Sequence, residues 1–411
     1  MSVNYVESGA WACRVVEEAF STPELRGRDF PRFRIALRHE ASEVAYSPHY
    51  RANTARPPRR CQARARHARS IQMVSRWRNR RLDGAGPILV PSDCSVVEPL
   101  LERPTREWVA TPDEMIEQSR LRKTKEWRKK VAPLWDQTPM SIPSQHGNHS
   151  IHINLHRWRK PRPAAALKAT LLAPVLWIHG GGMVLPSGSY GDPQLQILAP
   201  LGPELLIASM EYRLAPRHAC PAAALDVIDA LSWLHSQASA LGADASRLGV
   251  LGESAGGNLA AVAALHAAQQ PQLPVRYAVV FYPMVFNAFD TRSYSLFDKR
   301  DRSRGGLNKC GMEFFWRAYC PTAQACDDWR CTPLTAGLHR SHARSHPRTL
   351  VVSCSEDVLR DDGVRYHAAL RDAGVDVRHV QVPGDHGCTH RASHADLAPL
   401  FEGLRRNLLS A

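Results

Sequence analysis

A Gly-x-Ser-x-Gly pattern centred on Ser254 most constrains what this chain of 411 residues can fold into. Apolar residues 248–251 before it predict a buried strand, and residues 258–268 after it predict a helix. A serine on such a strand-to-helix turn has strained backbone angles that expose its hydroxyl. Gly252 and Gly256 suit this turn because side chains there would collide with it. The pattern therefore predicts Ser254 as a nucleophile.

A run of three glycines follows another predicted strand, over residues 175–178. The run is His179-Gly180-Gly181-Gly182. Glycine leaves its backbone N–H open to a substrate oxygen, because no side chain obstructs the approach. An oxyanion on an ester carbonyl needs such donors, and the N–H of Ala255, next to the nucleophile, is the expected partner donor. The alternative is a flexible glycine turn without a catalytic role.

Two pairs of acidic residues follow the predicted strand over residues 349–353. Glu356 and Asp357 lie nearer the strand end, where an acid that orients a catalytic base belongs. Asp361 and Asp362 precede a predicted helix, so helix capping is the simpler interpretation for that pair. The residues alone leave Glu356 and Asp357 open as the orienting acid.

His386 lies on a loop flanked by glycines, after a predicted helix over residues 364–373 and a predicted strand over residues 377–382. A loop histidine is commonly only a solvated side chain. A position just past a strand, however, suits a base that must reach the serine. The order serine, acid, histidine along the chain is that of the α/β-hydrolases.

Four ordered motifs resemble the hormone-sensitive-lipase-like family of α/β-hydrolase esterases. They are His179-Gly-Gly-Gly182, Tyr212-Arg-Leu-Ala-Pro216, Gly252-Glu-Ser-Ala-Gly-Gly257 and Asp357-Val-Leu-Arg-Asp361. The resemblance runs from about residue 174 to the C-terminus, with weaker coverage from about residue 110. It implies an α/β fold with a mostly parallel central sheet, flanking helices and a helical cap. Cys388 departs from the family pattern, in which a phenylalanine commonly follows the His-Gly pair.

The resemblance also implies a role for each site residue. It implies Ser254 as nucleophile, His386 as base and Asp357 as acid, with the N–H groups of Gly181, Gly182 and Ala255 as oxyanion donors. Further motif positions would support them, namely His179, Gly180, Gly252 and Gly256. Of these, His179 would shape the glycine loop without taking part in proton transfer.

These groups predict a serine carboxylic-ester hydrolase that acts on short- to medium-chain acyl esters through an acyl-enzyme, with an acetylated metabolite as one candidate substrate. The chemistry requires no metal and no organic cofactor. One alternative is a non-catalytic small-molecule receptor on the same fold, a role known for relatives that have lost the catalytic histidine. Another is an acyltransferase, because an alcohol can replace water. The presence of His386 favours an enzyme over a receptor.

The net charge of +14 is concentrated early in the chain, where residues 1–164 hold 30 Lys and Arg against 17 Asp and Glu. Residues 51–81 contain eleven arginines and no acidic residue. Such a run is typical of patches that bind nucleic acid or anionic membranes. No zinc-finger spacing, phosphate loop or aromatic RNA motif accompanies it, so nucleic acid is not the expected partner. We expect residues 1–90 to form a poorly ordered basic leader.

The remainder is expected to divide near residue 166. A capping threonine and a proline at the first helical position predict a helix over residues 112–130. Residues 91–165 would supply N-terminal cap helices and the first strands, and residues 166–411 the α/β-hydrolase catalytic domain. A cap insertion at about residues 287–330 would contribute aromatic side chains above the pocket.

The ten cysteines show no Cys-x-x-Cys spacing. Cys354 is expected to pack as a small buried hydrophobe, and Cys320, Cys326 and Cys331 are expected to form neither a metal site nor a disulfide. No signal peptide is evident, and the longest apolar run is too short to span a bilayer, so the predicted location is cytoplasmic. A small-molecule ester is the predicted partner, and the oligomeric state is left open.

Overall fold

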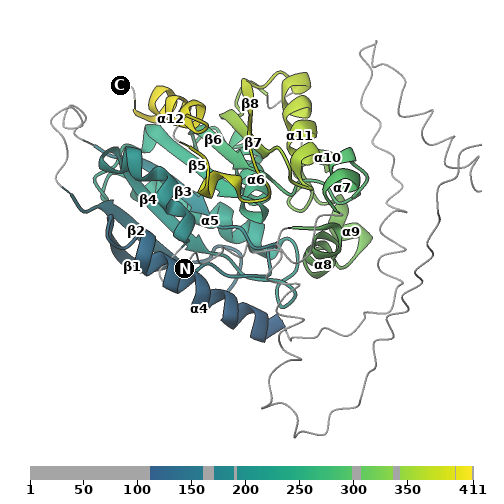
Figure 1. Cartoon of the computed structure of the whole chain (residues 1–411). Coiled ribbons are helices and arrows are strands. Elements are labelled where there is room, and N and C mark those ends of the chain that lie inside the picture. Colours follow the sequence, from purple (N-terminus) through teal and green to yellow (C-terminus); the bar gives the residue numbers. More distant parts are fainter. Residues whose placement is uncertain are drawn as a thin grey trace, which may run out of the picture. The chain divides into compact units, whose positions relative to one another are not determined.

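The computed structural model describes residues 112–160, 171–188, 192–298, 307–336, 343–393 and 395–409. Its centre is a sheet of eight strands (Figure 1). The strands are β1 (Trp135–Pro143), β2 (Ser150–Trp158), β3 (Ala173–Ile178), β4 (Leu205–Glu211), β5 (Leu248–Glu253), β6 (Val275–Phe281), β7 (Arg348–Cys354) and β8 (Val377–Val382). Their order is β1-β2-β4-β3-β5-β6-β7-β8. β1, β2 and β4 pair antiparallel, whereas every pair from β4 to β8 is parallel.

Helices connect these strands and pack on both faces of the sheet. The α-helices are α4 (Pro112–Lys130), α5 (Ala222–Gln237), α6 (Ala255–Ala268), α7 (Arg292–Phe297), α8 (Lys309–Tyr319), α9 (Ala323–Asp327), α10 (Pro333–Ala336), α11 (Arg360–Ala373) and α12 (Ala398–Leu404). In the described ranges, three 3₁₀-helical segments are η4 (Pro193–Glu204), η5 (Ala245–Arg247) and η8 (Cys388–His390), and a π-helical segment is η9 (Arg405–Leu409).

Side chains alternate along each strand and so build two separate cores. In β3, Leu176 and Ile178 pack on one face of the sheet, and Val175 and Trp177 pack on the other. The first core includes residues of α5, α6 and α11, and the second includes residues of η4, α12, η9 and α4. The parallel strands are buried on both faces, which explains their continuous apolar sequences.

The structure confirms the predicted helix over residues 112–130 and the predicted strand over residues 377–382. β5 continues through Glu253 and α6 begins at Ala255, so Ser254 alone separates strand from helix. α11 begins earlier than predicted, at Arg360, which places Asp361 and Asp362 inside its first turn.

The predicted leader, residues 1–90, lies outside the described residues, and the division of the chain into leader, cap and catalytic domain stays a prediction. In the part of the chain that is described, no helix combines the length and the apolar character needed to cross a membrane.

Candidate active site

The turn at Ser254 is as sharp as the sequence pattern predicts. Ser254 has φ 54° and ψ −116°, a backbone conformation that L-residues rarely adopt. A Cβ atom on Gly252 would lie 2.1 Å from the carbonyl oxygen of Gly256, and one on Gly256 would lie 2.1 Å from that of Ile178. Both glycines are therefore needed for the close approach of β5, α6 and the end of β3.

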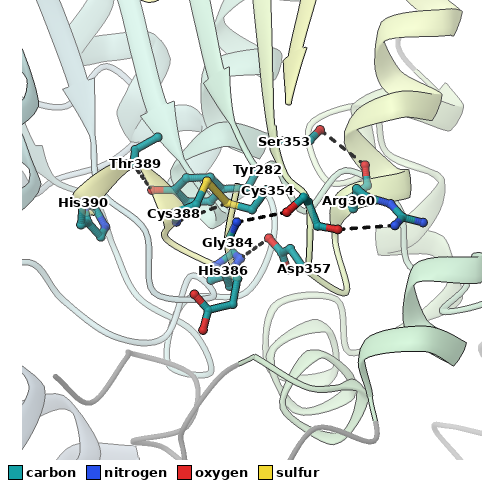
Figure 2. The surroundings of a disulfide bond; sticks show 12 residues. Tyr282, Ser353, Cys354, Asp357, Arg360, Gly384, His386, Cys388, Thr389 and His390 are labelled. Carbon is teal, nitrogen blue, oxygen red and sulfur yellow. Dashed lines mark hydrogen bonds and ion pairs between the residues drawn. A yellow bond between two sulfur atoms is a disulfide. The ribbon is translucent and has the colours of Figure 1, made fainter. Parts of the chain in front are cut away.

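His386 and Asp357 lie next to the serine in a chain of hydrogen bonds. The imidazole Nε2 of His386 is 3.0 Å from Ser254 Oγ, and its Nδ1 is 2.7 Å from Asp357 Oδ2. Both His386 and Asp357 are buried, and the other carboxylate oxygen, Oδ1, accepts the Leu359 N–H at 3.0 Å. Figure 2 shows His386 directed at Asp357. Of the two acids that the residues alone leave open, Asp357 rather than Glu356 contacts the imidazole through its side chain.

The glycine loop after β3 passes directly beside the serine. A Cβ atom on Gly180 would lie 3.2 Å from the Ser254 Cβ. Gly181 and Gly182 have φ 128° and 63°, values that favour glycine. No hydrogen bond within the described residues takes up the N–H groups of Gly181, Gly182 or Ala255. These three N–H groups therefore keep their donor capacity, in the residue that follows Ser254 and in a loop that reaches Ser254 at Gly180.

His179 lies behind this loop and does not contact the serine. Its ring stacks on Tyr212 with centroids 4.2 Å apart, and its Nδ1 is 2.8 Å from the Gly180 carbonyl oxygen. A carbonyl can only accept, so Nδ1 carries the proton. Burial, helped by the nearby Lys123 charge, lowers the pKa of His179 to about 3, so the ring is neutral.

A further group of polar residues contacts His386, and no motif in the sequence indicates it. Tyr282 donates from its hydroxyl to Glu253 Oε2 at 2.6 Å and lies 3.1 Å from Thr389 Oγ1. Its ring also packs edge-on against His386, with centroids 5.0 Å apart. Burial raises the pKa of the Glu253 carboxyl to about 8, with Asp192 adding repulsion. Glu253 is therefore largely protonated at neutral pH.

Two disulfides show that the expectation was wrong for Cys320, Cys331 and Cys354, whereas Cys326 is a free thiol as expected. Cys354, at the end of β7, is bonded to Cys388 on the loop that carries His386 (Figure 2). Cys320 is bonded to Cys331 between α8 and α10. Both pairs are buried, and spatial neighbours far apart in sequence give no local pattern.

One group of three residues in the described ranges has a spacing that a metal ion could use. It comprises Cys220, Cys320 and Cys331. Two of its sulfur atoms are joined to each other, which removes them as thiolate ligands. The absence of a metal from the predicted chemistry stays a prediction.

Known proteins resemble this chain over the same region. A model of a family with the α/β-hydrolase fold matches residues 175–390. An ethyl acetate hydrolase of Pseudomonas putida is 34% identical over 246 residues, which make up 60% of this chain and 73% of that enzyme. The carboxylesterase NlhH of Mycobacterium tuberculosis is 32% identical over 203 residues, 49% of this chain and 62% of that relative. The chain thus spans less than two thirds of the second relative's length.

Solved esterase structures share the fold. The thermostable carboxylesterase EstE1 from a metagenomic library aligns with a TM-score of 0.61 and 28% identity, over 73% of this chain and 98% of that one. An esterase of Pyrobaculum calidifontis aligns with a TM-score of 0.59 and 29% identity, over 72% and 90%. The family match covers more than half of the chain and agrees with the motifs, the sheet and these relatives. The chain therefore belongs to the hormone-sensitive-lipase-like carboxylesterases of the α/β-hydrolase fold.

Proposed function

We propose that Ser254 is the nucleophile of this esterase, with His386 as its general base and Asp357 as the acid that orients the base. The observation that carries the proposal is the continuous path of 3.0 Å and 2.7 Å from Ser254 through His386 to Asp357. These lengths suit proton transfer from the serine to the imidazole. The carboxylate fixes the tautomer that leaves Nε2 free to accept, and it stabilises the imidazolium that forms.

The reaction proceeds in two halves. Ser254 Oγ attacks the ester carbonyl as His386 Nε2 takes its proton, and the same proton passes to the departing alcohol when the tetrahedral intermediate collapses. Water then attacks the acyl-serine, His386 takes a proton from it, and the acid leaves with Ser254 restored. The free N–H groups of Gly181, Gly182 and Ala255 bind the oxyanion in both halves. Each such donor contributes about 10²–10³ in turnover.

The substrate class that we propose is short- to medium-chain acyl esters, with an acetylated metabolite as a candidate. The name of the Pseudomonas putida relative, an ethyl acetate hydrolase, supports a short acyl group. Phe315 of α8 packs on the glycine loop, because a Cβ atom on Gly182 would lie 2.1 Å from its ring. A ring so close to the oxyanion donors leaves little space beside them, which favours small acyl groups. We propose that α7–α10 belong to the cap.

The assignment is tested with p-nitrophenyl esters of increasing chain length and a fluorophosphonate probe. Ser254→Ala is expected to lower kcat by at least about 10³-fold and to abolish labelling, without loss of folded structure by circular dichroism. Ser246→Ala, at an exposed serine, is the matched control. Full activity of Ser254→Ala, or probe attached elsewhere, would overturn the assignment.

Two other activities make different predictions. A receptor would bind esters without turnover, and the position of His386 beside Ser254 argues against it. An acyltransferase would pass the acyl group to an added alcohol faster than to water. Product analysis of reactions with increasing glycerol distinguishes transfer from hydrolysis.

We also keep a cytoplasmic location and no role for nucleic acid as predictions. The two disulfides argue against a cytoplasmic location, because thiols in the cytosol are held reduced. Alkylation of thiols in intact cells, followed by mass spectrometry of the peptides with Cys354 and Cys388, reports which redox state the protein has. Filter binding of the full chain to nucleic acid at increasing salt concentrations tests whether the protein binds nucleic acid.

A further inference from the structure

A buried lysine lies close to the candidate site but has no part in the reaction described above. Lys123, on α4, is 6% exposed, whereas Leu121 on the same helix is 62% exposed. Burial of an ammonium group is unfavourable unless polar partners compensate for the lost water. The orientation of α4 thus places a charge inward and an apolar side chain outward, which calls for an explanation.

The carboxyl groups near Lys123 do not provide that explanation. Glu211 and Glu253 are both near enough for the lysine charge to lower their pKa, yet burial outweighs it and raises the pKa of each to about 8. At neutral pH both are therefore largely uncharged. Within the described residues Lys123 forms no ion pair, and its Nζ donates a hydrogen bond to the Gly180 carbonyl oxygen at 3.4 Å.

The Gly180 carbonyl is also held by His179 Nδ1 at 2.8 Å. A trans peptide is planar, so a carbonyl fixed on one side directs the next N–H, that of Gly181, to the opposite side. The following peptide is fixed in the same way, since the Gly181 carbonyl accepts the N–H groups of Val184 and Leu185 at 3.1 and 2.8 Å. The N–H groups of Gly181 and Gly182 are thus each oriented by the carbonyl group of the same peptide, which is held in place by hydrogen bonds.

Glycine makes this anchoring necessary. The Gly181 backbone has φ 128°, and a chain of glycines can rotate to other conformations at little cost. The ammonium group adds a further effect, because it polarises the peptide and so strengthens the N–H as a donor. Its positive charge also lies in a site of low dielectric constant, where its attraction for an oxyanion is stronger than in water.

We propose that Lys123 is a positioning residue of the oxyanion hole, which orients and polarises the Gly180–Gly181 peptide so that the Gly181 N–H faces the oxyanion. The inference rests on the proposed function of Ser254. It also gives α4, which precedes the sheet in the chain, a direct link to the chemistry.

The test compares Lys123→Met, which keeps the length of the side chain and removes its charge, with Lys125→Met, an exposed position on the same helix. We expect Lys123→Met to lower kcat by about tenfold, less than the roughly 10²–10³ for loss of a direct donor. KM for p-nitrophenyl acetate stays within about twofold, and Lys123→Arg recovers part of the rate. The urea midpoint does not fall, because a neutral side chain removes a desolvation cost.

A trifluoromethyl ketone, which forms a tetrahedral oxyanion on the nucleophile, provides the decisive measurement. Its inhibition constant is expected to rise by the same factor by which kcat/KM falls in Lys123→Met, and to stay unchanged in Lys125→Met. An unchanged kcat, or a lower kcat with an unchanged inhibition constant, overturns the inference. Failure of the proposed function is distinguishable, because the wild-type chain would then neither hydrolyse the ester nor react with fluorophosphonate at Ser254.

Discussion

Removal of the Cys354–Cys388 disulfide is expected to lower both the stability of the folded protein and its kcat, and the size of each loss can be worked out separately. The bond closes a segment of 34 residues, for which the chain-entropy relation gives about 4 kcal/mol. The Cys320–Cys331 bond closes 11 residues and gives about 3 kcal/mol by the same relation. A total free energy of unfolding of about 5–15 kcal/mol is usual for a folded protein. Loss of the Cys354–Cys388 bond is therefore a large destabilisation, but we expect the variant still to fold.

The effect on activity follows from what the bond connects. Cys354 ends the strand before the Asp357 loop, and Cys388 lies two residues after His386. Hydrogen bonds also hold these loops together, including Glu356 N–H to the Gly384 carbonyl at 2.8 Å. Because a 1 Å misplacement costs about 100-fold and these bonds remain, we expect kcat to fall by only about tenfold. KM stays nearly constant because the substrate contacts are unchanged.

The assay uses the paired variant Cys354→Ala with Cys388→Ala, and Cys320→Ala with Cys331→Ala as its control. Urea unfolding measures stability, and p-nitrophenyl acetate hydrolysis at low urea measures kcat. In the control, a reductant lowers both quantities. In the Cys354/Cys388 variant, stability and kcat are already low without reductant. The reductant then removes only the stability that the Cys320–Cys331 bond contributes. Equal stability and equal kcat in wild type and the Cys354/Cys388 variant would refute the reasoning.

Two further predictions concern carboxyl groups. Asp357→Asn is expected to lower kcat about 10⁴-fold while circular dichroism stays unchanged, and Glu356→Gln to stay within about twofold; the reverse order would identify Glu356 as the acid. Glu253, with its pKa raised to about 8, keeps a proton in the folded state that the unfolded state releases near pH 4.5. Its contribution to stability is complete below pH 4.5 and is lost as pH rises to about 8, by up to about 1.4 kcal/mol per pH unit. Urea unfolding from pH 5 to 8.5 is therefore expected to give a shallower decline in Glu253→Gln, and an identical slope would contradict the raised pKa.

The features that could be predicted from the sequence are local. The turn at Ser254 depends on a strand, two glycines and a helix within a few residues, and the structure has them in that order. The helix over residues 112–130 likewise follows from its own first turn. The choice between Glu356 and Asp357 needed the family resemblance, because the sequence does not show in which direction each of two adjacent acidic side chains points.

The features that could not be predicted join distant segments. Gly180 and Lys123 are 57 residues apart, and neither has a neighbour that indicates the other. The pairing of Cys354 with Cys388 depends on the parallel alignment of β7 with β8, which no pattern within either strand specifies. Asp362 carries the same lesson, because its carboxyl is fully buried rather than capping a helix from outside, and burial raises its pKa well above the usual range.

The order of strands in the sheet has a consequence for how such an enzyme diversifies. The proposed nucleophile, acid and base follow β5, β7 and β8, and the glycine loop follows β3, whereas the described part of the segment between β6 and β7 contributes none of them. That segment carries α7–α10 and approaches the glycine loop through Phe315. With the proposed site, residues 287–336 could therefore change with the substrate during evolution, while the groups proposed to perform the reaction stay in place at the ends of the strands.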